Sequence, residues 1–339
     1  MIFALRWRGR LMQRDIYMFS NGTVKRKDNT IYLESETDNK KRPLPVEQIE
    51  NLHLFGEVHL NSAFLNFMGQ KGIFVHFYNY YGFYTGSFVP REQKVSGIVT
   101  VRQSEHYLNK EKRLALAQSF VQSAAFHMIR FNRKKNNMES EFVKEIQELQ
   151  KQIATAKNVQ QLMGIEGMIR QNYYQSLNEL ILPEFQFSER TKRPPRDPFN
   201  ALISFGNTMM YTTILSEIYK TQLNPTISFL HEPSQKRFSL CLDLAEIFKP
   251  LFVDPLIVSL VNMKKIQPKH FEDYEGMVYL NEEGRKIFIA SFDKKLSVTI
   301  KHRQLNRNVS YRYFIRLECY KLIKHVIGDT PYKPLRAWW

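Results

Sequence analysis

The chain has 339 residues and is 43% hydrophobic, a composition that is typical of folded globular proteins and excludes a disordered chain. Its formal net charge of +16 at pH 7 favours polyanionic partners such as nucleic acid. It has two cysteines without zinc-binding spacing and no apolar run of the ~20 residues that span a bilayer, so we expect a cytoplasmic protein with no membrane contact.

Residues 1–92 predict a small β domain of the sandwich type. Asn21-Gly22 is a typical hairpin turn, and short strand-like segments separated by polar turns lie around it. Residues 61–70 predict one short helix. Two further strands are predicted from Ile73 to Phe77 and from Gly82 to Phe88.

After residues 90–93, which we interpret as a hinge, the hydrophobic period changes to that of helices. Apolar side chains recur at helical spacing from Leu114 to Met128 and again from Phe142 to Ile153. The predicted fold class is therefore α+β: a small N-terminal β-sandwich-like domain at 1–92, followed by a larger all-α catalytic domain at 93–339.

A proline-stiffened basic loop at residues 191–196 precedes a long apolar helix. Asp197 and Pro198 are the residue types that begin a helix, with Asp as the N-cap and Pro as the first helical residue. Because the helix is mostly apolar, we expect it to be central and buried. Its polar residues Asn200 and Asn207 are expected to form hydrogen bonds and to orient metal ligands.

The richest chemistry lies between residues 231 and 250. Asp243 and Glu246 are three residues apart, so a helix presents both carboxylates on one face. Their neighbours are apolar, and two carboxylates in such surroundings are costly unless a cation lies between them. With His231, twelve residues upstream, they form a hard ligand set suited to Mg²⁺ or Mn²⁺. A lone histidine at that place is otherwise more typical of a packed core residue.

A third carboxylate, Glu166, lies between Gly164 and Gly167. Glycines permit close approach of the backbone, which a metal ligand facing a phosphate would need. Taken alone, a glutamate in this place is more typical of a surface. Asp254 and Glu232 are further acids that we do not assign as metal ligands.

Positive charge gathers in the half of the chain that contains these acids. Residues 285–339 hold 13 Lys and Arg against 3 Asp and Glu. Any single one of these cations is also typical of a solvated surface. We expect DNA phosphate contacts from the following residues: Arg193, Arg196, Arg237, Lys249, Lys301, Arg303, Arg312 and Arg316. The terminal Trp338-Trp339 pair has three possible docking places, which are the domain itself, a partner protein and DNA bases.

Four separated motifs occur in a recognisable order. They are Gly164 to Gly167, the segment DPFNALISFGN at 197–207, HEP with DLAE at 231–246, and Val253-Asp254. In this order they resemble the CRISPR-associated spacer-acquisition integrase family, the universal adaptation nuclease of CRISPR systems. The resemblance is densest over residues 160–265. It implies a catalytic metal site formed by Glu166, His231, Asp243 and Glu246. At the position of Glu246, many family members have Asp instead.

The resemblance also implies a function. The family is a metal-dependent DNA integrase and endonuclease of CRISPR adaptation, which inserts short DNA fragments (spacers) into the repeat array by attack of a 3′-hydroxyl on a phosphodiester. It works as homodimers, joined through the N-terminal domain, and a small companion protein of ferredoxin-like fold bridges two dimers on double-stranded DNA. The residues alone leave three alternatives open: a non-catalytic DNA-binding scaffold, a general structure-specific nuclease, and a metallohydrolase of small molecules.

Overall fold

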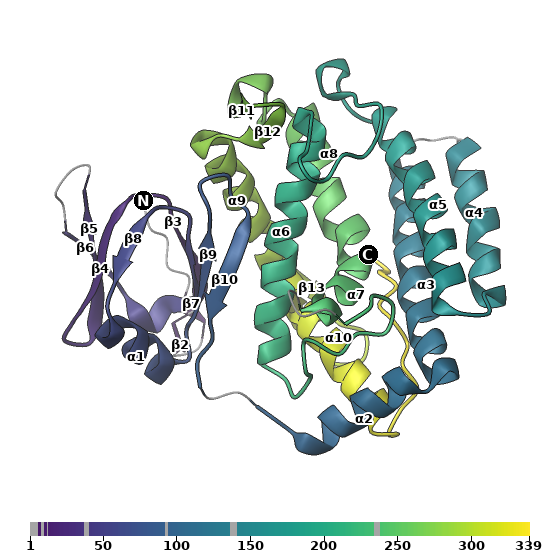
Figure 1. The fold of residues 1–339 in the computed structure, drawn as a ribbon, viewed down its shortest axis with the longest axis horizontal. Coiled ribbons are helices and arrows are strands. Elements are labelled where there is room, and N and C mark those ends of the chain that lie inside the picture. Colours follow the sequence, from purple (N-terminus) through teal and green to yellow (C-terminus); the bar gives the residue numbers. More distant parts are fainter. Residues whose placement is uncertain are drawn as a thin grey trace. The chain divides into compact units, whose positions relative to one another are not determined.

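The computed structural model describes residues 6–7, 10–11, 13–36, 41–91, 94–135, 141–233 and 238–339 (Figure 1). The chain divides into two compact units, Met1–Gln93 and Lys94–Trp339. The first unit is rich in strands and the second is mostly helical. The α+β fold class predicted from the sequence is thereby confirmed.

Two four-stranded sheets make up most of the first unit. One has the strand order β10-β9-β7-β3 and mixes parallel with antiparallel pairs, and the other has the order β6-β5-β4-β8. The strands of this unit are β1 (Arg6–Trp7), β2 (Arg10–Leu11), β3 (Arg14–Met18), β4 (Gly22–Lys27), β5 (Thr30–Ser35), β6 (Lys41–Leu44), β7 (Ile49–Leu54), β8 (Val58–Leu60), β9 (Phe74–Tyr78) and β10 (Tyr84–Phe88).

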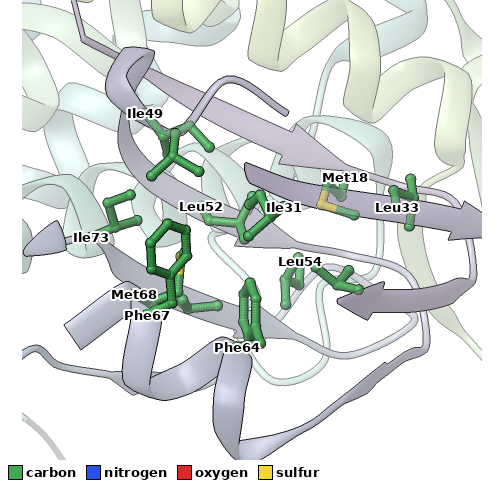
Figure 2. Close-up of a cluster of buried hydrophobic side chains, with 13 residues drawn as sticks. Met18, Ile31, Leu33, Ile49, Leu52, Leu54, Phe64, Phe67, Met68 and Ile73 are labelled. Atoms are coloured by element: carbon green, nitrogen blue, oxygen red, sulfur yellow. The ribbon is translucent and has the colours of Figure 1, made fainter. Parts of the chain in front are cut away.

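A shared hydrophobic core joins the two sheets to helix α1 (Ser62–Lys71), as Figure 2 shows. The helix begins at Asn61, whose side chain accepts from the backbone N–H of Phe64, and it ends at Gly72 in the left-handed conformation. Both sheets and one face of the helix contribute to this core, with side chains that include Met18, Ile31, Leu33, Leu52, Phe64, Phe67 and Met68. Two sheets around one core are the arrangement of a β-sandwich.

The hairpin predicted at Asn21-Gly22 is wrong. β4 begins at Gly22 itself, and the turn that joins β4 to β5 contains Asp28, whose φ is 54°. Gly22 is needed for a different reason: a Cβ at this position would lie 2.1 Å from the carbonyl oxygen of Glu34. The glycine therefore permits the close approach of two strands rather than a turn.

The second unit consists mainly of helices, and within the described residues none is both long and apolar enough to cross a membrane. The helices are α2 (Gly97–Leu108), α3 (Lys110–Lys135), α4 (Glu141–Gln152), α5 (Val159–Asn178), α6 (Pro198–Tyr219), α7 (Ser239–Phe248), the π-helix η4 (Lys249–Val253), α8 (Asp254–Asn262), α9 (Glu282–Ser297) and α10 (Tyr311–Val326). Short 3₁₀ turns occur at Ile153–Thr155, Pro183–Phe185 and Pro268–His270.

The sequence predicted that the second unit is purely helical, but the structure also contains two β-hairpins in it. One hairpin pairs β11 (Phe271–Tyr274) with β12 (Met277–Leu280), and another pairs β13 (Thr299–Lys301) with β14 (Asn308–Ser310). The first turn is formed by Glu275 and Gly276, with φ values of 52° and 77°. Two consecutive positive φ values are the geometry of the tight turns that close two-residue hairpins.

Most side chains of helix α6 are buried, so this helix lies inside the second unit. It begins as predicted, because the Asp197 side chain accepts from the backbone N–H of Asn200 at 2.8 Å and Pro198 is the first helical residue. At Gly206 a Cβ would lie 2.6 Å from Cγ1 of Val253, in η4. This glycine therefore lets α6 approach η4, which follows the predicted metal motif in the chain.

The C-terminal segment packs on its own unit. Glu318 of α10 accepts from the backbone N–H of Leu335 at 3.1 Å, and His127 of α3 accepts from that of Ala337 at 3.1 Å. The indole N–H of Trp339 donates to the hydroxyl of the first residue of α10 at 2.6 Å. Of the three docking places considered for the tryptophan pair, the structure therefore has it on the domain itself.

Candidate active site

Two of the predicted ligands, Glu166 on α5 and Glu246 on α7, share one arginine. Nε of Arg170 donates to Oε1 of Glu166 at 2.6 Å, and the same guanidinium forms an ion pair with Glu246 through Nη2. Glu166 and Arg170 are four residues apart on α5, the spacing at which helical side chains meet. The guanidinium thus links the two helices through their carboxylates.

Glu246 has a second cation. Nζ of Lys249 lies 3.0 Å from Oε1 of Glu246, which is only 3% exposed. Burial and, to a smaller extent, the charge of Arg170 lower the pKa of Lys249 to about 8, against the opposing effect of Glu166. Each carboxylate oxygen of Glu246 therefore faces a basic side chain.

The pKa of Glu166 lies below its ordinary value. Burial acts in the opposite direction and raises it, but the charge and hydrogen bond of Arg170 outweigh burial, with smaller contributions from Lys249 and His231. Glu166 is therefore ionised at neutral pH, and His231 lies close enough to influence it. The three elements α5, α7 and the 229–231 loop meet at this point.

Asp243 is fully buried and accepts four hydrogen bonds. One carboxylate oxygen accepts from the backbone N–H groups of Phe229 at 2.6 Å and Leu230 at 3.0 Å. The other accepts from the backbone N–H of His231 at 2.9 Å and lies 2.8 Å from its ring Nδ1. Both carboxylate oxygens of Asp243 therefore form hydrogen bonds with the loop that contains His231.

His231 is fixed from two sides. Asp243 holds Nδ1 of its ring, an arrangement in which a carboxylate orients a histidine and leaves Nε2 for another partner. The same loop is anchored from α3, because Arg113 donates to the carbonyl of Phe229 at 2.8 Å and pairs with Glu232 at 2.7 Å. Glu232 is therefore an anchor of the loop, and this histidine is not packed in the core, because its side chain is 21% exposed.

The four predicted ligands therefore form two pairs, Glu166 with Glu246 through Arg170 and His231 with Asp243 directly. Across the part of the chain that the structure describes, no group of three or more His, Cys, Asp or Glu side chains has an arrangement that could hold a metal ion. The donor types suit a hard divalent cation. The two glutamates, however, already have Arg170 as their counter-ion.

We expected Asn200 and Asn207 to orient the metal ligands. Among the described residues, however, neither asparagine forms a hydrogen bond with any of the four predicted ligands. Asn200 is buried, donates to the carbonyl of Glu189 at 2.8 Å and accepts from Arg190 at 2.8 Å. It thus holds the basic loop to the start of α6. The side-chain oxygen of Asn207 is buried and has no hydrogen-bond partner within the described part of the chain.

The residues predicted to bind DNA differ in what they contact. Arg193, Arg196, Lys301 and Arg303 are exposed, and the guanidinium of Arg303 also lies over the Trp338 ring at 5.0 Å. Lys249 pairs with Glu246 as described. Arg237 lies outside the described residues.

Arg312 and Arg316 have internal acidic partners. Nε of Arg316 donates to the fully buried Glu217 at 2.6 Å, and Arg312 lies 3.9 Å from Asp293. Glu217 belongs to α6, so the Arg316 pair ties α10 to the central helix. A structural role is therefore evident for Arg316.

Sequence reasoning missed Arg170. A signal was present, because the arginine follows Glu166 by one helical turn. The sequence could not indicate that α7 would bring Glu246 to the same guanidinium.

Known proteins identify the chain more directly. A family model described as CRISPR associated protein Cas1 matches residues 16–294. The CRISPR-associated endonuclease Cas1 of Clostridium perfringens is 55% identical over 331 residues, which cover 97% of this chain and 100% of the relative. The solved structure of a CAS1 protein from Thermotoga maritima has a TM-score of 0.87 and 41% identity, covering 96% of this chain and 100% of that one.

Two more distant structures share the fold. A casposase bound to integration product has a TM-score of 0.83 at 17% identity, with 96% of this chain and 97% of that chain covered. A Cas6-RT-Cas1–Cas2 complex has a TM-score of 0.82 at 18% identity, with 99% of this chain and 37% of that chain covered. The family that the four motifs predicted is confirmed by the full-length matches above: the chain belongs to the CRISPR-associated Cas1 family.

Proposed function

We propose that this Cas1 family member is a divalent-metal-dependent DNA integrase and endonuclease of CRISPR adaptation, and that Glu166, His231 and Glu246 hold the cation. The nuclease and integrase class follows from the family, whose relatives match over the full chain and are named endonucleases. The metal and the roles of individual residues are the proposed part. The observation that carries them is the meeting of two carboxylates from α5 and α7 beside a histidine that a third carboxylate orients.

The hydrogen bonds of Asp243 favour a division of labour among the four residues. Its oxygens each have two donors, so we assign it to holding the loop and the ring of His231 rather than to direct ligation. Glu166, Glu246 and Nε2 of His231 would then be the protein ligands of Mg²⁺ or Mn²⁺, once their side chains move from the described arrangement, which does not itself form a metal site. This differs from our sequence-based expectation, in which Asp243 was a main ligand and Glu246 assisted.

The reaction is a transesterification on DNA. The oxygen of a 3′-hydroxyl attacks the phosphorus of an array phosphodiester, and the 3′-oxygen of the array strand leaves with a proton. Water in place of the 3′-hydroxyl gives hydrolysis. A divalent cation held by Glu166, His231 and Glu246 would polarise the phosphate and stabilise the entering or leaving oxygen. Exposed basic side chains, which include Arg193, Arg196, Lys301 and Arg303, are the proposed contacts to DNA phosphates.

The proposed assembly follows the family. A solved chain of the same fold is part of a complex with a Cas2 protein. We propose that this chain also binds double-stranded DNA as a homodimer, joined through the first unit, and that a small ferredoxin-like companion bridges two dimers.

Strand transfer into a supercoiled plasmid that carries a repeat array tests the function. With the companion protein and Mn²⁺ present, the wild-type chain is expected to join short duplexes to the array, and omission of Mn²⁺ or Glu166→Gln is expected to abolish joining. The matched control is Glu148→Gln, which removes an exposed carboxylate on α4. Equal joining by wild type and Glu166→Gln at saturating Mn²⁺ would refute the proposed site.

A further inference from the structure

We propose that Arg170 is the resident cation of the active site: its guanidinium occupies the position between Glu166 and Glu246, and a divalent ion must displace it to bind. This inference rests on the proposed function, because it concerns the same two carboxylates. It makes Arg170 a residue that controls metal loading.

The contacts define the competition. Arg170 reaches Glu166 from the same helix and Glu246 from α7, and these side chains are 16%, 19% and 4% exposed. The guanidinium engages Oε1 of Glu166 and Oε2 of Glu246, so a hard cation that binds between the two carboxylates competes with it for these oxygens. Glu246 keeps one further cation, Lys249, on its other oxygen. The arginine and the divalent ion therefore cannot share the same carboxylate oxygens.

The exchange preserves charge where the carboxylates are buried. Two ionised carboxylates in a partly buried site repel each other, so one cation must replace the other for both to stay ionised. The pKa of Arg170 lies above its ordinary value. Burial lowers this pKa, but Glu166 and Tyr174 raise it by more, so the guanidinium is charged.

The displaced guanidinium needs a new anionic partner. A DNA phosphate at the reacting position would supply one, and arginine binds phosphate through paired N–H donors. Metal and DNA should consequently strengthen each other's binding through Arg170, and such coupling is reciprocal.

The test is the affinity for Mn²⁺ alone, measured by electron paramagnetic resonance without DNA. Arg170→Gln is expected to bind Mn²⁺ about tenfold more tightly than wild type, a change equivalent to ~1.4 kcal/mol. Arg102→Gln is the matched control, because it removes the same charge from an exposed Arg–Glu pair on α2 and should leave the affinity unchanged. Added duplex DNA should tighten Mn²⁺ binding in wild type more than in Arg170→Gln.

The outcomes separate the two proposals. Wild-type Mn²⁺ binding that Arg170→Gln does not strengthen overturns the role of Arg170 and leaves the proposed function standing. Absence of Mn²⁺ binding in both proteins overturns the metal site itself. If Arg170→Gln does not fold, NMR of the arginine Nε–H groups in the wild type tests the displacement instead. Comparison with Arg170→Lys assigns the Arg170 signal. The Arg170 signal should change on saturation with Mg²⁺, and an unchanged signal contradicts displacement.

Discussion

The two acids of α7 differ in the chemical nature of their partners. Among the described residues, Asp243 accepts from N–H groups of the 229–231 loop, whereas Glu246 faces two flexible basic side chains, Arg170 and Lys249. Backbone donors cannot leave without unfolding the loop, but long basic side chains can rotate away. Glu246 is therefore the acid of α7 that can change partners when a cation binds.

Asp243→Asn is expected to destabilise the protein in the absence of metal by about 3 kcal/mol, because an amide offers fewer acceptors to buried N–H groups. Glu246→Gln should cost less, because its partners are flexible basic side chains and Arg170 keeps Glu166 as a counter-ion. Thermal unfolding of the two variants without divalent ions measures this difference. Equal melting temperatures for the two variants would mean that the Asp243 hydrogen bonds are not structural.

The family resemblance of the motifs predicted one site formed by Glu166, His231, Asp243 and Glu246, but not the separate role of each acid. Asp243 and Glu246 look alike in the sequence, since both are carboxylates among apolar neighbours. Only the folded loop shows that the backbone N–H groups of residues 229–231 converge on Asp243. The role of Arg170 depends likewise on the packing of α5 and α7, which no local pattern encodes.

Gly164 and Gly167 next to Glu166 offer a test of where DNA lies. Both are inside α5, and a Cβ on either would have no atom within 4 Å. Glycine in a helix interior costs about 0.5–1 kcal/mol relative to alanine, so each Gly→Ala change should stabilise the protein by roughly that amount. Strand transfer should nevertheless fall, because the methyl groups would obstruct the DNA backbone.

Unfolding by denaturant and the plasmid assay check the two halves of this prediction. Gly206→Ala is the contrasting variant, since its methyl group would clash with Val253 and should lower stability. If the variants at 164 and 167 are more stable and fully active, DNA does not approach this face of α5.

At the scale of whole elements, strong local signals were read correctly. The Asp-Pro start of α6 and the helical periods that became α3 and α4 appear in the structure as predicted. The hairpin of β11 and β12 was missed, because its Glu275-Gly276 turn is a weaker signal than Asn-Gly. The Asn21-Gly22 pair gave the opposite error, because its glycine serves close strand contact instead.

A hydrogen bond to His127 of α3 holds the C-terminal segment, and this histidine must be neutral to accept it. His127 accepts from the backbone N–H of Ala337, and burial, with a contribution from Arg130, lowers its pKa from 6.5 to about 3. Below pH 6.5 the unfolded chain therefore binds a proton that the folded chain does not, and stability falls as pH falls, by about 1.4 kcal/mol per pH unit, until pH reaches about 3.

His127→Gln keeps an acceptor and removes this titration. Between pH 7 and pH 5, the stability of wild type relative to the variant is therefore expected to fall by about 2 kcal/mol. Free energies of unfolding of both proteins at the two pH values give the comparison, and other titrating groups, such as Asp254, cancel in it. A pH-independent difference would mean that His127 is protonated in the folded chain.

On the scale of the whole molecule, the basic residues behind the net charge of +16 have different roles. Part of it neutralises acids inside the second unit, as Arg316 does for Glu217 and Arg170 for the two active-site glutamates. The net charge predicted a polyanionic partner, but it could not distinguish cations that pair internally from those that face solvent. Among the described residues that we predicted to bind phosphate, Arg193, Arg196, Lys301 and Arg303 are exposed.

The most direct test of the account is strand transfer by Glu246→Gln and Asp243→Asn as a function of Mn²⁺ concentration, at a temperature where both variants are folded. We expect Glu246→Gln to be inactive at every Mn²⁺ concentration, because it lacks a ligand. Asp243→Asn should retain measurable activity that rises with Mn²⁺, since its ligands remain but His231 is less well held. Full activity of Glu246→Gln at saturating Mn²⁺ would contradict the assignment of Glu246 to the metal.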